Sequence, residues 1–200
     1  ANDRIQQIFD TYTSYVLYNY TEKDAFWTQT AAGGAAQIYR AIMGEPRHVD
    51  AMLDYIQDIW LQFFPEEFLK KGGMPYRVFL ADSIYWDRGW GKTLYNYRIN
   101  GNALIIGGMN KDLTTMDAVT KRTRKNELLG AMWDYYIAQG LLNVPDEFYE
   151  DTDYENAPAL PLDGENLEAY RKRGFLPTFN SYSGAQEEWY WGDYPWTQAK

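Results

Sequence analysis

Three residues, Asn126, Glu127 and Gly130, have the types and spacing that come nearest to a catalytic pattern. They lie in the stretch 112–140, which predicts one long helix, so Asn126 and Gly130 share a face with Glu127 beside them. The spacing is that of HExxH, in which two imidazoles on one helix face bind zinc and the glutamate is the general base. Here the frame reads NELLG. Without a metal to lower the pKa of a bound water, Glu127 has no activated water to act on.

Histidine and cysteine counts limit the chemistry further. His48 is the single histidine and there is no cysteine, which excludes disulfides, thiol catalysis and zinc–thiolate sites. A zinc site built on imidazoles needs two or three of them, and carboxylates alone suit calcium, magnesium or manganese better. His48 lies near the start of the predicted helix 46–64, far in sequence from any evident nucleophile. We interpret it as a surface or helix-terminal histidine.

The composition limits the classes of partner that the protein can bind. The net charge is −9 and the basic stretches are short, at 70–71 and 121–125. Phosphate binding needs clustered positive charge, so no nucleic-acid partner is expected. The 18 tyrosines, 9 phenylalanines and 8 tryptophans predict either an aromatic-rich core or platforms that stack on a ligand.

The helices are predicted from periodicity and end signals. In 112–140, Thr114 and Asp117 resemble a capping box, and Gly140 marks the end. The second half of this stretch is almost wholly apolar and is predicted to be buried. Residues 46–64 form the clearest amphipathic pattern, with Pro46 in the first turn and Pro65 after it. A shorter helix is predicted over 1–12.

The strands are predicted from alternation and turn residues. Residues 14–20 and 76–81 are strands, 82–91 an aromatic loop, and 35–43 a short helix or a connection. A hairpin joins 94–99 to 103–106 through Asn100-Gly101. The acidic stretch 144–156 is either a solvated loop or, through Asp151, Asp153 and Glu155, a calcium site. The sequence thus predicts one α+β domain over 1–200, with a small, twisted, mostly antiparallel sheet packed on long helices and a loop-rich C-terminal part.

Several strings together resemble a known family over nearly the whole chain, at low identity. The chain resembles the substrate import-associated zinc metallohydrolase lipoproteins of Bacteroidetes, which are zincin-like putative metallopeptidases. The matching strings are residues 17–20, 54–64, 76–82, 101–110, 173–175 and 187–189.

The active-site motif is where this chain departs from the family pattern. The first ligand histidine falls on Asn126, the general base on Glu127 and the second histidine on Gly130. Glu187 or Glu188 matches the acidic region that supplies a third ligand. The resemblance therefore implies a zincin-like fold in which zinc has been lost and Glu127 is a vestigial general base.

The expected function follows from the resemblance: a catalytically inactive lipoprotein of the cell envelope, at the outer membrane or cell surface. It would bind or scaffold in nutrient uptake, with an outer-membrane import complex as partner and a peptide or glycan as ligand. The signal and lipid anchor would lie outside these residues. Replacing Glu127 by Gln should then leave binding nearly unchanged. Candidate contacts are Asn126, Gly130, Glu187, Glu188, Trp86 and Trp90.

Two alternatives remain open. One is an active hydrolase that uses Glu127 with Glu187 or Glu188 and a non-standard metal site. The other is a glycan-binding module that uses exposed aromatic side chains such as Trp86 and Trp90. For each tryptophan, packing in the core is the competing interpretation.

Overall fold

The computed structural model describes residues 2–26, 38–87, 91–143, 145–150, 178–179 and 189–190. The chain divides into two compact units, Ala1–Leu142 and Asn143–Lys200. In the second unit, α6 covers Glu147–Glu150, and the strands β7 (Thr178–Phe179) and β8 (Trp189–Tyr190) form an antiparallel pair. The predicted acidic ligands Asp151, Asp153 and Glu155 lie outside the described residues.

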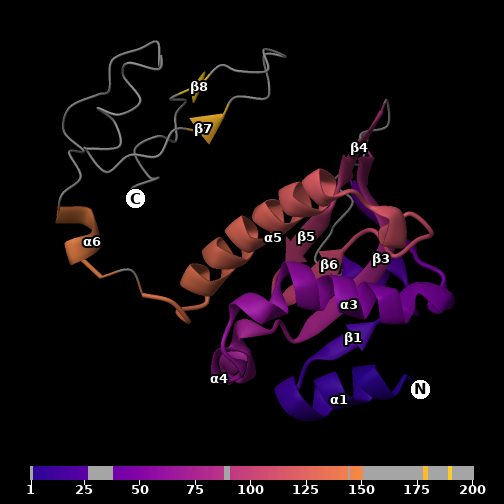
Figure 1. Ribbon diagram of the computed structural model, residues 1–200, viewed down its shortest axis with the longest axis horizontal. Coiled ribbons are helices and arrows are strands. Elements are labelled where there is room, and N and C mark those ends of the chain that lie inside the picture. The colour runs from indigo at the N-terminus through magenta and orange to yellow at the C-terminus, as the bar shows by residue number, and fades with distance from the viewer. Residues whose placement is uncertain are drawn as a thin grey trace. The chain divides into compact units, whose positions relative to one another are not determined.

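The sheet of the first unit is built around one long strand, β3 (Arg77–Asp87). Its first half pairs in parallel with β1 (Tyr15–Leu17) and β6 (Ala103–Ile106). Its second half pairs antiparallel with β2 (Ile38–Met43) and β4 (Lys92–Tyr95), and β5 (Tyr97–Asn100) lies antiparallel outside β6 (Figure 1). The α+β class is confirmed. The sheet is mixed, with parallel pairing at its centre, where Val78 to Ala81 are buried on both faces as parallel strands require.

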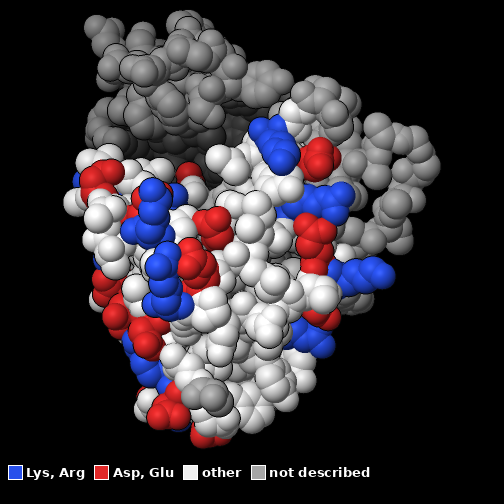
Figure 2. Space-filling model, turned by 90° about the vertical axis from the view of Figure 1, so that its right-hand side faces the viewer, with Lys and Arg blue, Asp and Glu red and all other residues white. Residues whose placement is uncertain are grey.

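The main helices are α1 (Asp3–Tyr12), α3 (Val49–Ile59) and α5 (Ala118–Ala138). Ion pairs join them at the surface: Arg4 of α1 lies 2.7 Å from Asp54 of α3, and Lys121 of α5 pairs with Asp58 near the end of α3. On the face drawn in Figure 2, cationic and anionic side chains lie next to one another and neither sign forms a continuous patch. Among the described helices, none has the length and apolar character needed to cross a membrane.

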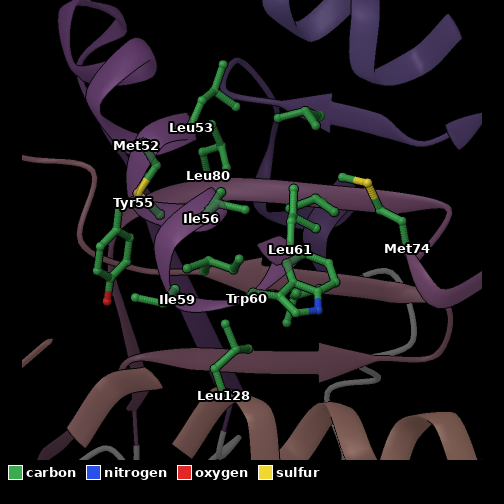
Figure 3. Close-up of a cluster of buried hydrophobic side chains, with 14 of the residues drawn as sticks. Met52, Leu53, Tyr55, Ile56, Ile59, Trp60, Leu61, Met74, Leu80 and Leu128 are labelled. Atoms are coloured by element: carbon green, nitrogen blue, oxygen red, sulfur yellow. The ribbon is translucent and has the colours of Figure 1, made fainter. Parts of the chain in front are cut away.

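The core is formed where α3 and α5 cover one face of the sheet. Figure 3 shows Leu128 of α5 directed toward Ile59 and Trp60 at the end of α3, in the same buried cluster as Leu80 of β3. Within it the Trp60 indole N–H donates to the Tyr136 hydroxyl at 2.9 Å, and both side chains are fully buried. The opposite face carries a smaller cluster that includes Phe79, Ile105 and the last residue of α2 (Glu22–Ala25).

The predicted helix 46–64 is confirmed in its central part and is divided at both ends. A 3-10 turn η1 (Pro46–His48) precedes α3, and a second, η2 (Leu61–Phe63), follows it after Trp60. The chain then forms α4 (Glu66–Phe68) and a short π-helical segment, η3 (Leu69–Gly73). Gly72 there has a φ of 108°, which a residue with a Cβ rarely adopts.

Two strand predictions were wrong. The stretch 82–91 was expected to be a loop, but its residues up to Asp87 continue β3, and residues 38–43 form β2 instead of a helix or connection. A register shift between Ile42 and Met43 opposite β3 interrupts the alternation of side chains. A bulge of this kind breaks the period of two by which strands are read from sequence.

The hairpin prediction is confirmed in part: within the predicted strand 94–99 only the residues from Tyr97 onward pair with β6, Leu94 and Tyr95 belong to β4, and the turn is moved by one residue. Asn100 pairs with Ala103, so Gly101 and Asn102 form the turn, and Gly101 has the φ of 60° that a tight hairpin needs. The side chain of Asn100 instead donates to the backbone oxygen of Ala25 at 2.9 Å.

The start of α5 and the burial of its second half differ from prediction. Residues Leu113–Thr115 form a separate 3-10 turn, η4, and Asp117 is itself the N-cap that accepts from the N–H groups of Val119 and Thr120. Trp133 and Ile137 are 51% and 41% exposed, so the second half is not wholly buried. A helix on one face of a sheet buries a single stripe. That stripe comprises Leu128, Met132, Tyr135 and Tyr136.

Candidate functional site

A groove of about 800 Å³ is lined by residues of α5 and of the strands at the edge of the sheet. Glu127 is on its helical wall, together with residues spaced three and four apart along α5. The opposite wall is the edge formed by β4, β5 and the hairpin turn. The lining residues are Leu94, Tyr95, Asn96, Tyr97, Arg98, Ile99 and Gly101 from the sheet, and Glu127, Ala131, Asp134, Tyr135, Ala138 and Gln139 from the helix.

At Asn96 the chain passes from β4 to β5, and the edge of the sheet moves outward by one strand. Before Asn96, β4 pairs directly with β3; after it, β5 lies one strand further out, beside β6. The backbone oxygen of Asn96 accepts from Gly107 at 2.8 Å. Its side-chain Nδ2 donates to Glu127 Oε2 at 2.7 Å. This bond ties the carboxylate to the sheet edge and spans the groove from one wall to the other.

The outer edge of β5 is unpaired within the part of the chain that the structure describes. Hydrogen-bonded and non-bonded pairs alternate along an antiparallel ladder. Because Asn96 and Asn100 bond toward β6, the backbone N–H and C=O groups of Tyr97 and Ile99 point outward, toward the groove. These are the groups that an added strand would engage.

The charged residues that line the groove are two carboxylates, Glu127 and Asp134, and one guanidinium, Arg98. Burial raises the pKa of Tyr97, Glu127 and Asp134 raise it further, and Arg98 lowers it, so all three charged groups act on the same ring. Among the described residues, no lysine or arginine forms an ion pair with Glu127 or Asp134. The guanidinium of Arg98 lies 3.9 Å from the centre of the Tyr39 ring, which packs in the cluster on the other face of the sheet.

Asn126 and Gly130 do not line the groove. Both are exposed, and no atom outside the local backbone lies within 4 Å of the place a Cβ on Gly130 would take. They share their side of the helix with Trp133, whereas Glu127 faces the sheet edge. The three frame positions are thus divided between two faces of α5. The described part of the chain contains no group of three or more His, Asp or Glu that could hold a metal ion.

The remaining predicted residues lie elsewhere. Trp86, near the end of β3, stacks on Tyr39 with ring centres 6.2 Å apart and is not part of the groove. Trp90, Glu187 and Glu188 lie outside the described residues. His48 is half-buried at the N-terminus of α3, and its Nε2 has no hydrogen-bond partner among the described atoms.

Sequence reasoning missed Asn96, Tyr97 and Asp134. Asp134 carried a usable signal, because it lies seven residues after Glu127 and so on the same helical face. No sequence signal identified Asn96 and Tyr97 on the sheet side of the groove. Their position depends on the tertiary structure, because the chain shifts from β4 to β5 at Asn96.

Comparison of the chain with family models, with curated proteins and with solved structures finds no match.

Proposed function

We propose that this protein is a non-catalytic binding protein whose groove holds an extended peptide segment. The observation that carries the proposal is the unpaired outer edge of β5 facing an open groove of about 800 Å³. An extended segment that adds to such an edge gains main-chain hydrogen bonds, and its alternate side chains enter the groove. β5 is four residues long, so an added strand pairs with it over about four residues, and a longer segment extends beyond the ends of β5.

The surroundings of Glu127 favour binding over catalysis. Its carboxylate accepts from Asn96, and the positions expected to hold metal carry an amide and a glycine that face away from the groove. A general base must lie next to an activated water or nucleophile. Hydrolysis by Glu127 with Glu187 or Glu188 stays an alternative prediction, because both partners lie outside the described residues.

We further propose that the fold is a degenerate zincin-like one. In support, β6 is the last strand before α5, with the 3-10 turn η4 between them, which is the order that the resemblance implies for the strand before the active-site helix. From the same resemblance we propose a lipid-anchored protein of the cell envelope that accompanies an outer-membrane import complex.

The test is to map binding on the protein. The probe is the neutral peptide Ac-Thr-Val-Thr-Val-Thr-Val-NH2, added to the isotope-labelled full chain and followed by backbone amide shifts in NMR. Saturable shifts should concentrate at the amides of Tyr97 and Ile99 and along α5 from Glu127 to Gln139. Saturable shifts confined to other surfaces, or none at millimolar peptide, would reject the proposal.

A second candidate function, glycan binding, is favoured by one observation at a different place. Beside β1, a pocket of about 390 Å³ is lined by Tyr15 and Tyr76, two residues that are 41% and 45% exposed and whose ring centres are 5.3 Å apart. Asp24 and Arg77 line the same pocket and could bond sugar hydroxyls. Loss of glycan-array signal in Tyr76→Ala, with signal kept in Trp86→Phe, would support this function. An array without signal for the wild-type chain would reject it.

A further inference from the structure

We propose that the groove selects peptide segments with lysine or arginine at alternate positions, on the side that faces α5. This inference rests on the proposed function and names its ligand class. It is carried by the placement of Glu127 and Asp134 on one wall, opposite the unpaired edge of β5.

The spacing of the two carboxylates suits an extended segment. They are seven residues apart on α5, which is about 10.5 Å along the helix axis. In a strand, alternate residues on one face are about 6.7 Å apart. Two neighbouring basic residues on that face therefore reach both carboxylates with flexible side chains. Ala131 and Ala138, on the same stripe, are small and leave room for the aliphatic stems of those side chains.

The negative charge of the groove is available to a ligand because the cations on nearby elements are engaged elsewhere. Lys121 pairs with Asp58, Lys125 lies over the ring of Phe63, and Arg98 lies over Tyr39. Arg124 lies near the Tyr55 hydroxyl, where its charge opposes the rise in the pKa of Tyr55 that burial causes. The Asn96 amide holds Glu127 through Oε2, which leaves Oε1 to accept from an incoming ammonium or guanidinium.

The exposure of the two carboxylates limits how much affinity a basic peptide gains over a neutral one. Glu127 and Asp134 are exposed, and one exposed ion pair changes affinity by up to about fivefold. Two pairs should therefore give a basic segment an advantage of about tenfold over a neutral one at low salt. The expectation that Glu127→Gln leaves binding nearly unchanged is thereby limited to neutral ligands.

The experiment compares three peptides by isothermal titration calorimetry. They are Ac-Thr-Val-Thr-Val-Thr-Val-NH2 and its counterparts with lysine or with glutamate at every threonine. Each is titrated into the full chain at 50 and 300 mM NaCl. The test variant combines Glu127→Gln with Asp134→Asn. The matched control combines Asp3→Asn with Glu67→Gln, which changes net charge equally at exposed sites outside the groove.

The expected result is that the lysine peptide binds about tenfold tighter than the threonine peptide at 50 mM salt. The advantage should shrink at 300 mM and disappear in the test variant, while the control keeps it. Equal binding of lysine and threonine peptides would overturn the charge selection and leave the groove's function standing. Binding of no peptide, or preference for the glutamate peptide, would overturn the inference. Concentration-dependent dimerisation that the lysine peptide does not reverse would also overturn it, because the edge would then pair with a second copy.

Discussion

The buried bond between Trp60 and Tyr136 is the polar contact at the centre of the core, joining the end of α3 to α5. Removing the hydroxyl leaves a buried indole N–H without an acceptor. We predict that Tyr136→Phe lowers the free energy of unfolding by about 1–3 kcal/mol. Urea denaturation followed by tryptophan fluorescence measures the change. Tyr135→Phe, on the same helix and outside this bond, is the control and should change stability less; equal effects of the two would contradict the assignment.

Metal content follows from the residues at the frame positions. An amide at Asn126, a glycine at 130 and a single carboxylate at Glu127 are weak ligands for zinc, which proteins bind mostly through imidazole and thiolate. We predict that protein purified without chelators contains far less than one zinc per chain by plasma mass spectrometry. One tightly held zinc per chain, lost in Glu127→Gln, would instead favour the hydrolase alternative.

The candidate site could be predicted from sequence only in part. Glu127 could be identified because the pattern around it, NELLG, lies within a single helix. Spacing along one helix can be read directly from the sequence. Asn96 could not be found this way, since its role depends on a strand that contacts a helix 31 residues later. The division of Asn126 from Glu127 between two faces of α5 was also hidden, because spacing gives the relative angle of side chains but not which of them meets the sheet.

At the scale of elements, the start of α5 depends on Asp117. Hydrogen bonds from the Thr120 hydroxyl and backbone N–H hold the pKa of Asp117 below its usual range. A carboxyl group with a lowered folded-state pKa contributes stability above its unfolded pKa, and this is lost as pH falls through the folded value.

We therefore predict that Asp117→Ala lowers the thermal midpoint at pH 7, and that its deficit relative to wild type shrinks as pH falls below the usual aspartate range. Asp117→Asn, which keeps a capping oxygen without the charge, should lie between the two at pH 7. Circular dichroism melts across pH 3 to 7 measure this. A deficit that stays constant across that range would contradict the role of the ionised cap.

Sequence predicted the elements whose signals are local. The hairpin around Gly101 and the amphipathic α3 were found because turn residues and a period of 3.6 are short-range patterns. In β3, by contrast, Phe79, Ala81 and Ile84 all belong to one buried cluster, so the alternation shifts between Ala81 and Ile84. The sequences of the second half of β3 and of its partner β2 therefore lack the regular alternation by which strands are predicted. Their pairing is fixed by long-range contacts such as Tyr39 with Trp86.

At the scale of the whole molecule, the net charge is −9. Composition does not reveal where on the surface the negative charge lies without a cationic partner. Carboxylates on α3 lie against an arginine of α1 and a lysine of α5 in ion pairs, whereas those in the groove have no such partner among the described residues. An acidic chain is thus expected to attract basic ligands specifically at the groove, where shape and an unpaired strand edge coincide with uncompensated charge.

The central claim is that a ligand adds to β5 as a strand, and N-methylation of the probe tests it most directly. In an added strand, alternate peptide N–H groups donate to the edge and the others point away from it. Two versions of the lysine–valine peptide, N-methylated on one alternate set or on the other, are compared by calorimetry with the unmethylated peptide. The account predicts that one methylated version loses binding and the other keeps it. Equal binding by both would show that no strand is added and would contradict the account.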